Sequence, residues 1–203
     1  IGSHAYMLRA LPDDPRYKDR DLRQVRVNCV PGVESQIEII EGRPFSDADT
    51  SDELLLWARP GFLDKLGMRT GEEFELFNYN AVHPDVPLRF RVAGTWQAKD
   101  PSGAFWYRDP HDLMAEEFLT SVGAFSNFIA PYMPQQVDFT FLYYVLDEGH
   151  LRFAEVDRYT RGVELAKLKA EAMLPSTRVD RTPVEPLTDV QMRTRVLKRL
   201  LYG

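Results

Sequence analysis

The sequence predicts an α+β protein, because strand-like and helix-like patterns occupy different parts of the chain. Before residue 98, several short segments alternate apolar with polar residues, which is the pattern of half-buried strands. Residues 153–173 instead repeat apolar side chains every three or four positions, as an amphipathic helix does, and the C-terminal residues do the same. With 203 residues and 44% apolar composition, the chain is long enough for one sizeable core or two small ones.

The composition argues against two classes of partner. Lys and Arg number 25 against 31 Asp and Glu, so the net charge is -6 and a surface for nucleic acid or anionic lipid is not expected. The longest apolar runs fall well short of the roughly 20 residues that a membrane helix needs. Because the first residue is Ile1 rather than Met, we expect the chain to be part of a longer protein. The single cysteine, Cys29, cannot form an internal disulfide and is expected in a strand.

The first part of the chain is expected to be mostly strand. After a short apolar stretch at residues 6–11, residues 12–22 are rich in Pro and charge and predict a loop. Pro60 suits the first turn of a short helix, and Gly67 closes it with a positive φ. The expected strands are 25–29, 37–41, 54–57, 74–76 and 88–94, and the expected helix is 60–66.

A loop over residues 98–110 carries three adjacent aromatic residues, Phe105, Trp106 and Tyr107. We expect this cluster to fill the core beneath the loop. The alternative is an aromatic shelf that faces a ligand.

The second part is expected to contain a strand over 137–146 and a long helix over 153–173 that Pro175 stops. Thr188 and Gln191 have the spacing of a capping box, which predicts a last helix from residue 188. Its apolar side chains follow a 3-4-3-4 spacing, typical of a coiled-coil seam. This seam either folds back onto the domain or forms a stem that points away, and it consists of Leu187, Val190, Thr194, Leu197 and Leu201.

No motif for catalysis, cofactor binding or metal binding is evident, so we expect a protein that is not an enzyme and holds no cofactor. The four histidines, at positions 4, 83, 111 and 150, are too far apart in sequence to predict a metal site. The adjacent acidic pairs Glu72/Glu73 and Glu116/Glu117 are expected to lie on solvated faces.

One run of segments resembles the extracytoplasmic domains of FtsX-like and MacB-like ABC transporter permeases. In those domains a strand ends in a Glu-Gly-Arg-x-Phe turn, as Glu41-Gly42-Arg43-Pro44-Phe45 does here. An apolar strand, a helix ending in Leu-Gly, a Gly-Asp or Gly-Glu pair and a Val-x-Gly strand then follow in the family. This chain matches them in that order over residues 37–96 with Leu54-Leu55-Leu56, Leu66-Gly67, Gly71-Glu72 and Val92-Ala93-Gly94.

The resemblance implies a two-lobed, MacB-like periplasmic core domain with mixed β-sheets and packed helices, ending in a stem helix. Its first, porter-like lobe would be residues 1–112, its second lobe 113–187, and its stem 188–203, leading toward a membrane span. The implied role is non-catalytic, on the extracytoplasmic side of the cell membrane, in a homodimer or pseudo-dimer. The implied partners are the rest of the permease chain, an ATPase subunit and an envelope protein or lipoprotein. We expect the stem positions Leu187, Val190, Leu197 and Leu201 to act as the lever.

Two other functions stay open on the sequence. One is a carbohydrate-active or hydrolytic enzyme with Phe105, Trp106 and Tyr107 at its substrate site, which paired carboxylates in a pocket beside that loop would favour. The other is a free-standing binding module.

Overall fold

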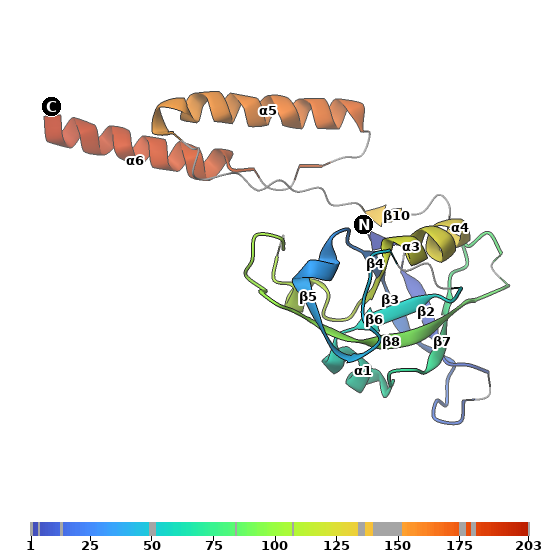
Figure 1. The fold of residues 1–203 in the computed structure, drawn as a ribbon. Helices are drawn as coiled ribbons and strands as arrows, with labels where there is room; N and C mark the ends of the chain where they lie inside the picture. Colours follow the sequence, from blue (N-terminus) through green and yellow to red (C-terminus); the bar gives the residue numbers. More distant parts are fainter. Residues whose placement is uncertain are drawn as a thin grey trace. The chain divides into compact units, whose positions relative to one another are not determined.

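The computed structural model describes residues 2–3, 5–12, 14–48, 52–83, 85–106, 108–133, 137–139, 152–174, 178–179 and 182–202. By their contacts the residues divide into two compact units, Ile1–Tyr143 and Tyr144–Gly203. The first unit holds a mixed β-sheet with short helices, and the second holds two long helices, so the α+β prediction is confirmed (Figure 1).

The first unit contains strands β1 (Gly2–Ser3), β2 (Tyr6–Arg9), β3 (Asp21–Val25), β4 (Val27–Cys29), β5 (Ile37–Gly42), β6 (Leu55–Ala58), β7 (Glu73–Phe77), β8 (Leu88–Ala98), β9 (Phe118–Thr120) and β10 (Val137–Phe139). Its helical segments are the 3-10 turn η1 (Val33–Gln36), α1 (Pro60–Leu66), α2 (Pro110–Leu113), α3 (Val122–Ala124), the π-helical η2 (Phe125–Ile129) and α4 (Ala130–Tyr132).

The sheet curls back on itself. Its strand order is β10-β1-β4-β9-β6-β8-β7-β2-β3, with β5 paired to β8 in addition. The pairs β4–β9 and β6–β8 are parallel and the others antiparallel. Only Arg26 separates β3 from β4 in the chain, although they lie far apart in this order, so the sheet must bend round to bring them together. Figure 1 shows α1 below the curled sheet and α3 and α4 above it.

Two apolar clusters pack on opposite sides of the central strands. In β6, the side chain of Leu56 belongs to one cluster and the side chains of Leu55 and Trp57 to the other, because successive residues of a strand face opposite ways. All four residues of β6 are buried, which confirms the prediction of a strand covered on both faces. The first cluster fills the curl and also takes in Phe62 of α1 and Ile129 of η2. The second lies under β5, η1 and α2.

The α1 helix ends as its sequence predicts. Pro60 stands at its first position, and Gly67 adopts the left-handed conformation with φ 66°. The backbone N–H of Gly67 donates to the carbonyl of Asp64, and that of Met68 to the carbonyl of Leu63. These bonds satisfy two of the carbonyls that a helix end leaves open.

The segments of the family resemblance meet at one place in the sheet. Gly42 in β5 lies opposite Gly94 in β8, with φ 98° at Gly42. A side chain on Gly42 would come within 2.6 Å of the Gly94 Cα atom. The Gly71 N–H donates to the carbonyl of Val92 at 2.7 Å, and the Arg43 N–H to the carbonyl of Ala93 at 2.9 Å. The turn after β5, the turn before β7 and the middle of β8 are therefore fastened together by backbone contacts.

The expected strand over 25–29 is wrong as a single element. It is broken at Arg26 into β3, which pairs with β2, and β4, which pairs with β1 and β9. The alternation of side chains continues through the break, because Val25 and Val27 both face the first cluster. Periodicity alone therefore does not reveal the change of partner.

Residues 113–133, expected to begin a second lobe, lie within the first unit of contacts. The reason is β9, which pairs with β4 on one side and β6 on the other. Of the strand expected over 137–146, Val137–Phe139 forms β10 against β1, and the rest lies outside the described residues.

The second unit contains the 3-10 turn η4 (Phe153–Glu155), α5 (Val156–Met173) and α6 (Val184–Tyr202). The prediction of a long helix over 153–173 is confirmed apart from its first turn. The capping box at Thr188 is wrong, because α6 begins four residues earlier. The Leu187 N–H already donates to the carbonyl of Pro183 at 3.0 Å, and the Thr188 hydroxyl donates to the carbonyl of Val184 at 2.8 Å. Thr188 thus lies in the helix interior.

Cys29 lies in β4 with 2% of its surface exposed, as the sequence predicts for a strand residue. Burial raises the pKa of its thiol from 9.0 to about 11. The folded state therefore favours the neutral thiol, and this stabilisation is complete below pH 9 and is lost as the pH rises through about 11.

We expect the unfolding free energy of the native chain to fall between pH 9 and about 11 more steeply than that of the Cys29→Ala variant. Urea titrations at successive pH values measure the difference, and parallel curves would contradict it.

Candidate functional site

The four proposed stem residues all lie on α6, but they differ in exposure. Leu187 is half-buried, whereas Val190 and Leu197 are 53% and 57% exposed. Leu201 is part of the helix, and its side chain lies outside the described set. The predicted seam is therefore partly covered and partly open to solvent.

The partner of the covered part is α5. The Gln191 side-chain amide donates to the Asp157 carboxylate on α5 at 2.9 Å, and Thr194, about one turn from Gln191, is also half-buried. Figure 1 shows α6 extending past the end of α5. The exposed seam residues Val190 and Leu197 lie in the first and second halves of α6, so the open part is not confined to one end of the helix.

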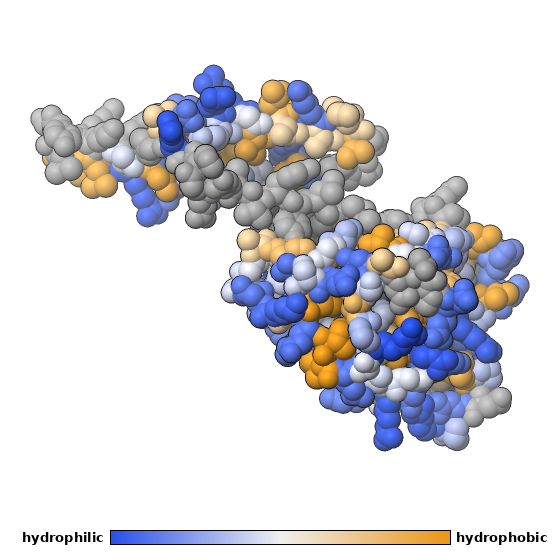
Figure 2. Space-filling model, in the orientation of Figure 1, coloured by the Kyte–Doolittle hydropathy of each residue, from blue (hydrophilic) through white to orange (hydrophobic). Residues whose placement is uncertain are grey.

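Both long helices carry further exposed apolar side chains, visible in orange among the charged residues in Figure 2. On α5 they include Leu165 and Leu168, 54% and 64% exposed, and on α6 Met192, Val196 and Leu200, 59%, 52% and 77% exposed. Isolated exposed apolar residues are ordinary, but this number on two neighbouring helices is typical of a surface that packs against something.

The aromatic loop packs onto the second apolar cluster, as expected. Phe105 and Trp106 are half-buried there, and Trp106 stacks on the fully buried Trp96 with ring centroids 6.2 Å apart. Phe105 meets Trp106 edge-on at 5.0 Å. Tyr107 lies outside the described residues.

Trp106 also lines a cavity of about 510 Å³, together with Pro101, Ser102, Arg108 and Asp109. The loop therefore contributes both to the core and to a hollow. Among the described lining residues Asp109 supplies the one carboxylate, and one of its oxygens accepts the His111 backbone N–H at 2.8 Å, capping α2. The pair of carboxylates that would favour a hydrolase does not occur in that lining.

Arg59 lies in the chain between β6 and α1 and contacts Trp96, on which Trp106 stacks. Its guanidinium carbon is 5.6 Å from the centre of the Trp96 ring, within the range of a cation–π contact. Burial lowers the pKa of Arg59, and the charge of Asp109 opposes that shift. The Nη1 atom of Arg59 is buried without a hydrogen-bond partner, as are the indole nitrogens of Trp96 and Trp106. Arg59 and Trp96 did not stand out in the sequence, because no motif surrounds them and the stack forms only in the fold.

A second cavity, of about 540 Å³, has a lining in which the main charges are already paired. Arg23 binds Glu116 at 2.5 Å, and Arg26 lies 3.7 Å from Glu117. The hydrogen bond from Arg23, followed by one from Lys65, holds the pKa of Glu116 below its ordinary value.

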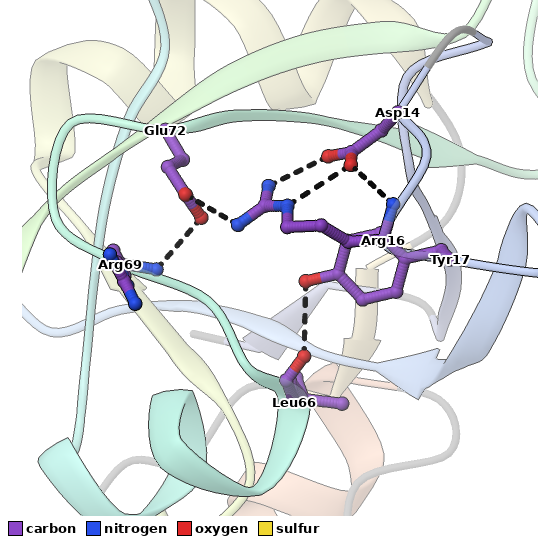
Figure 3. A network of polar contacts seen from close by, with 6 residues as sticks. All are labelled: Asp14, Arg16, Tyr17, Leu66, Arg69 and Glu72. Carbon is purple, nitrogen blue, oxygen red and sulfur yellow. Dashed lines mark hydrogen bonds and ion pairs between the residues drawn. The ribbon is translucent and has the colours of Figure 1, made fainter.

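A polar network fastens the 12–20 loop to the turn after α1 (Figure 3). Arg16 binds both oxygens of Asp14, at 3.0 and 2.7 Å, and reaches Glu72 at 2.6 Å. The bonds from Arg16 lower the pKa of Asp14. The Tyr17 hydroxyl donates to the carbonyl of Leu66 at 3.1 Å. Since Arg16 is largely solvated, this network orders a loop and adds little stability.

The described residues contain neither a cluster of metal ligands nor a helix able to span a membrane. No group of three His, Cys, Asp or Glu side chains in these ranges could share a metal ion. None of the helices described, including α5 and α6 with 18 and 19 residues, has the apolar content of a membrane span. Comparison with protein-family models and with curated proteins found no match to the chain.

Proposed function

We propose that residues 1–203 form a non-catalytic extracytoplasmic domain of a dimeric ABC transporter permease. The observation that carries the proposal is that three segments resembling the permease family lie together in the fold. They are the turn after β5, the turn before β7 and the middle of β8. Gly42, Gly71 and Gly94 come from separate parts of the sequence, yet they lie within one set of backbone contacts around Val92 and Ala93. Side chains at Gly42 or Gly94 would collide with the opposite strand. If this chain has the fold of the permease domains, these contacts explain why glycines stand in the same order in both.

The role proposed for the domain is to relay movement of the membrane helices to a substrate, a lipoprotein or another envelope protein. Such a relay needs a lever joined to a rigid body. The curled sheet, with its two buried clusters, supplies the rigid body. The long α6 helix supplies the lever, and the exposed Val190 and Leu197 are available for contacts outside this chain. By the resemblance, an ATPase subunit would drive the movement through the rest of the permease.

Cysteine labelling in the whole transporter tests both the location and the relay. The only cysteine in these residues, Cys29, is buried with a raised thiol pKa, so it reacts slowly with maleimides. With cysteines elsewhere in the parent protein replaced by serine, Val190→Cys and Leu197→Cys are expected to react with a membrane-impermeant maleimide in intact cells whose outer layers are permeabilised. Their labelling rates should change several-fold when ATP hydrolysis is trapped with vanadate.

Lys18→Cys is the matched control, because Lys18 is exposed in the 12–20 loop of the first unit. It should react with the same reagent at a rate that nucleotide does not alter. Labelling of all three variants only after the cells are lysed would contradict an extracytoplasmic location. Labelling from outside with no effect of nucleotide at positions 190 and 197 would contradict the relay.

A further inference from the structure

The α6 helix has two unlike sides. Its half-buried residues Leu187, Gln191 and Thr194 lie on one side, within an arc of about 60° at roughly 100° per residue. From this side Gln191 donates to Asp157 of α5. The exposed apolar residues lie outside that arc and are between 52% and 77% exposed, and they are Val190, Met192, Val196, Leu197 and Leu200. One side of α6 therefore meets α5, and the other presents apolar side chains to solvent.

The exposed apolar residues cover a broad sector of α6. By the same spacing, they spread over about 160° of the helix. Met192, Val196 and Leu200 form a row at intervals of four residues, which drifts round the helix and does not keep the alternating spacing of a coiled coil. A narrow seam suits a second helix, whereas a broad apolar sector suits a flat partner.

Basic residues accompany this sector. After Asp189 the helix holds Arg193, Arg195, Lys198 and Arg199 and no acidic residue. Arg193 lies within the apolar sector, and its side chain is 77% exposed and pairs with Asp189 at 2.8 Å. Positions 195, 198 and 199 fall outside the sector by helical spacing. From residue 190 onward, α6 thus combines an open apolar side with positive charge, which is complementary to an anionic surface.

The acidity of the whole chain does not extend to the second unit. The net charge of -6 is the reason why a surface for anionic lipid is not expected from the composition. Residues 144–203, however, hold 11 Lys and Arg against nine Asp and Glu, so their net charge is +2 and the excess of acidic residues lies in the first unit. The overall composition averages two units of opposite charge.

We propose that α6, from residue 190 onward, binds the surface of an anionic lipid bilayer. The helix lies along the surface with Met192, Val196 and Leu200 in the interface, and its basic residues reach the headgroups. Apolar burial and attraction to anionic headgroups add in such helices. A long arginine side chain such as that of Arg193 can extend past apolar neighbours to the headgroups. The proposal does not rest on the transporter role, so a negative vesicle test would leave the labelling test of that role standing.

Flotation of the purified 203-residue chain with lipid vesicles tests the proposal. Vesicles of phosphatidylcholine with about 30% phosphatidylglycerol are expected to bind the chain at least tenfold more tightly than vesicles of phosphatidylcholine alone. Raising the salt concentration from about 0.05 M to about 0.5 M should weaken this binding several-fold, because salt screens the attraction. Absence of binding to the anionic vesicles, or equal binding to both kinds, would overturn the proposal.

Variants of the apolar residues assign the binding to a helix. Val196→Ser combined with Leu200→Ser is expected to weaken binding to the anionic vesicles at least tenfold. The melting temperature of the free chain should not change, because both side chains are exposed. Leu165→Ser combined with Leu168→Ser is the matched control, since these residues are 54% and 64% exposed on α5, and it should bind within twofold of the native chain. An equal loss in the two double variants would overturn the assignment to α6.

Variants of the basic residues test the role of charge in the same way. Lys198→Gln combined with Arg199→Gln removes two positive charges from α6, and it should weaken binding at least fivefold and reduce its dependence on salt. Lys167→Gln combined with Lys169→Gln removes two from α5 and should change binding by less than twofold. Equal effects of the two pairs would show a general attraction of the second unit to the vesicles, contrary to the proposal.

Sedimentation equilibrium distinguishes a lipid surface from a second copy of the chain as the partner of this apolar sector. The native chain and the Val196→Ser, Leu200→Ser double variant are expected to have the same mass in solution. A dimer of the native chain that the double variant abolishes would show that the apolar sector pairs two copies, and it would overturn the proposal.

Discussion

The Gly94→Ala variant of this chain is expected to lose about 3 kcal/mol or more of unfolding free energy, or not to fold. An added Cβ atom would lie 3.2 Å from the Gly42 Cα atom and closer still to the carbonyl oxygen of Glu41. Both neighbours are backbone atoms of β5, held by the pairing of β5 with β8. They cannot move aside without opening the sheet beside its longest strand. Urea denaturation followed by circular dichroism measures the loss.

Gly61→Ala is the matched control for this substitution. Gly61 lies in the first turn of α1 with no other atom within 4 Å of an added Cβ. Alanine favours the helix over glycine, so the variant should be as stable as the native chain or up to about 1 kcal/mol more stable. Equal stability of the Gly94→Ala and Gly61→Ala variants would show that the close approach of β5 and β8 has been misplaced.

Trp57→Ala is expected to lower the unfolding free energy by about 3–5 kcal/mol, the range for truncation of a large buried aromatic side chain. Trp57, on β6, is fully buried in the second apolar cluster, against the turn after β5. Its ring meets Phe45 edge-on with centroids 4.9 Å apart, and its indole donates to the carbonyl of Arg43. The substitution would leave a cavity and an unsatisfied carbonyl in the turn that carries the family resemblance.

A double-mutant cycle separates the contact from the general loss of volume. Trp57→Ala and Phe45→Ala are expected to be non-additive by about 1 kcal/mol, as is usual for an aromatic pair in contact. Ile40→Ala on β5 serves as the control, because Ile40 is 51% exposed and its truncation should change stability by less than about 0.5 kcal/mol. Additive effects of the first two substitutions would mean that the Phe45–Trp57 pair contributes nothing of its own.

The elements that the sequence predicts well are those whose signals are local. The helix α1 ends at Gly67, and β6 is buried on both faces, because a positive-φ glycine and a continuous apolar run are readable over a few residues. The α5 helix follows from the spacing of its apolar residues. These features need no knowledge of what the element packs against.

The errors arise where a choice between partners decides the structure. The break at Arg26 leaves the alternation of side chains intact, and β9 is three residues long with no distinctive pattern. At the start of α6, the interpretation of Thr188 as a cap rests on a motif that fits the sequence. The helix instead starts at Val184 and includes Pro186 in its first turn, where proline is tolerated.

Of the two candidate sites, one follows from local spacing in the sequence and the other depends on contacts between distant residues. The stem seam on α6 is visible in the spacing of Leu187, Val190 and Leu197, since residues three and four apart share a helix face. The contacts of Arg59 are not visible, because its guanidinium meets Trp96 across a separation of 37 positions, and Trp96 in turn stacks on Trp106. Phe105 and Trp106 stand out as aromatic residues, but their neighbours do not.

The sequence by itself determined the α+β class, the helix stripes and the glycines at which the chain turns. Each of these depends on the conformational preferences of a few neighbouring residues. Only the tertiary structure decided that the sheet curls back to join β3 to β4, that Gly42 meets Gly94, and that Trp106 stacks on Trp96. These outcomes depend on contacts between residues far apart in the chain, which packing selects and no local pattern encodes.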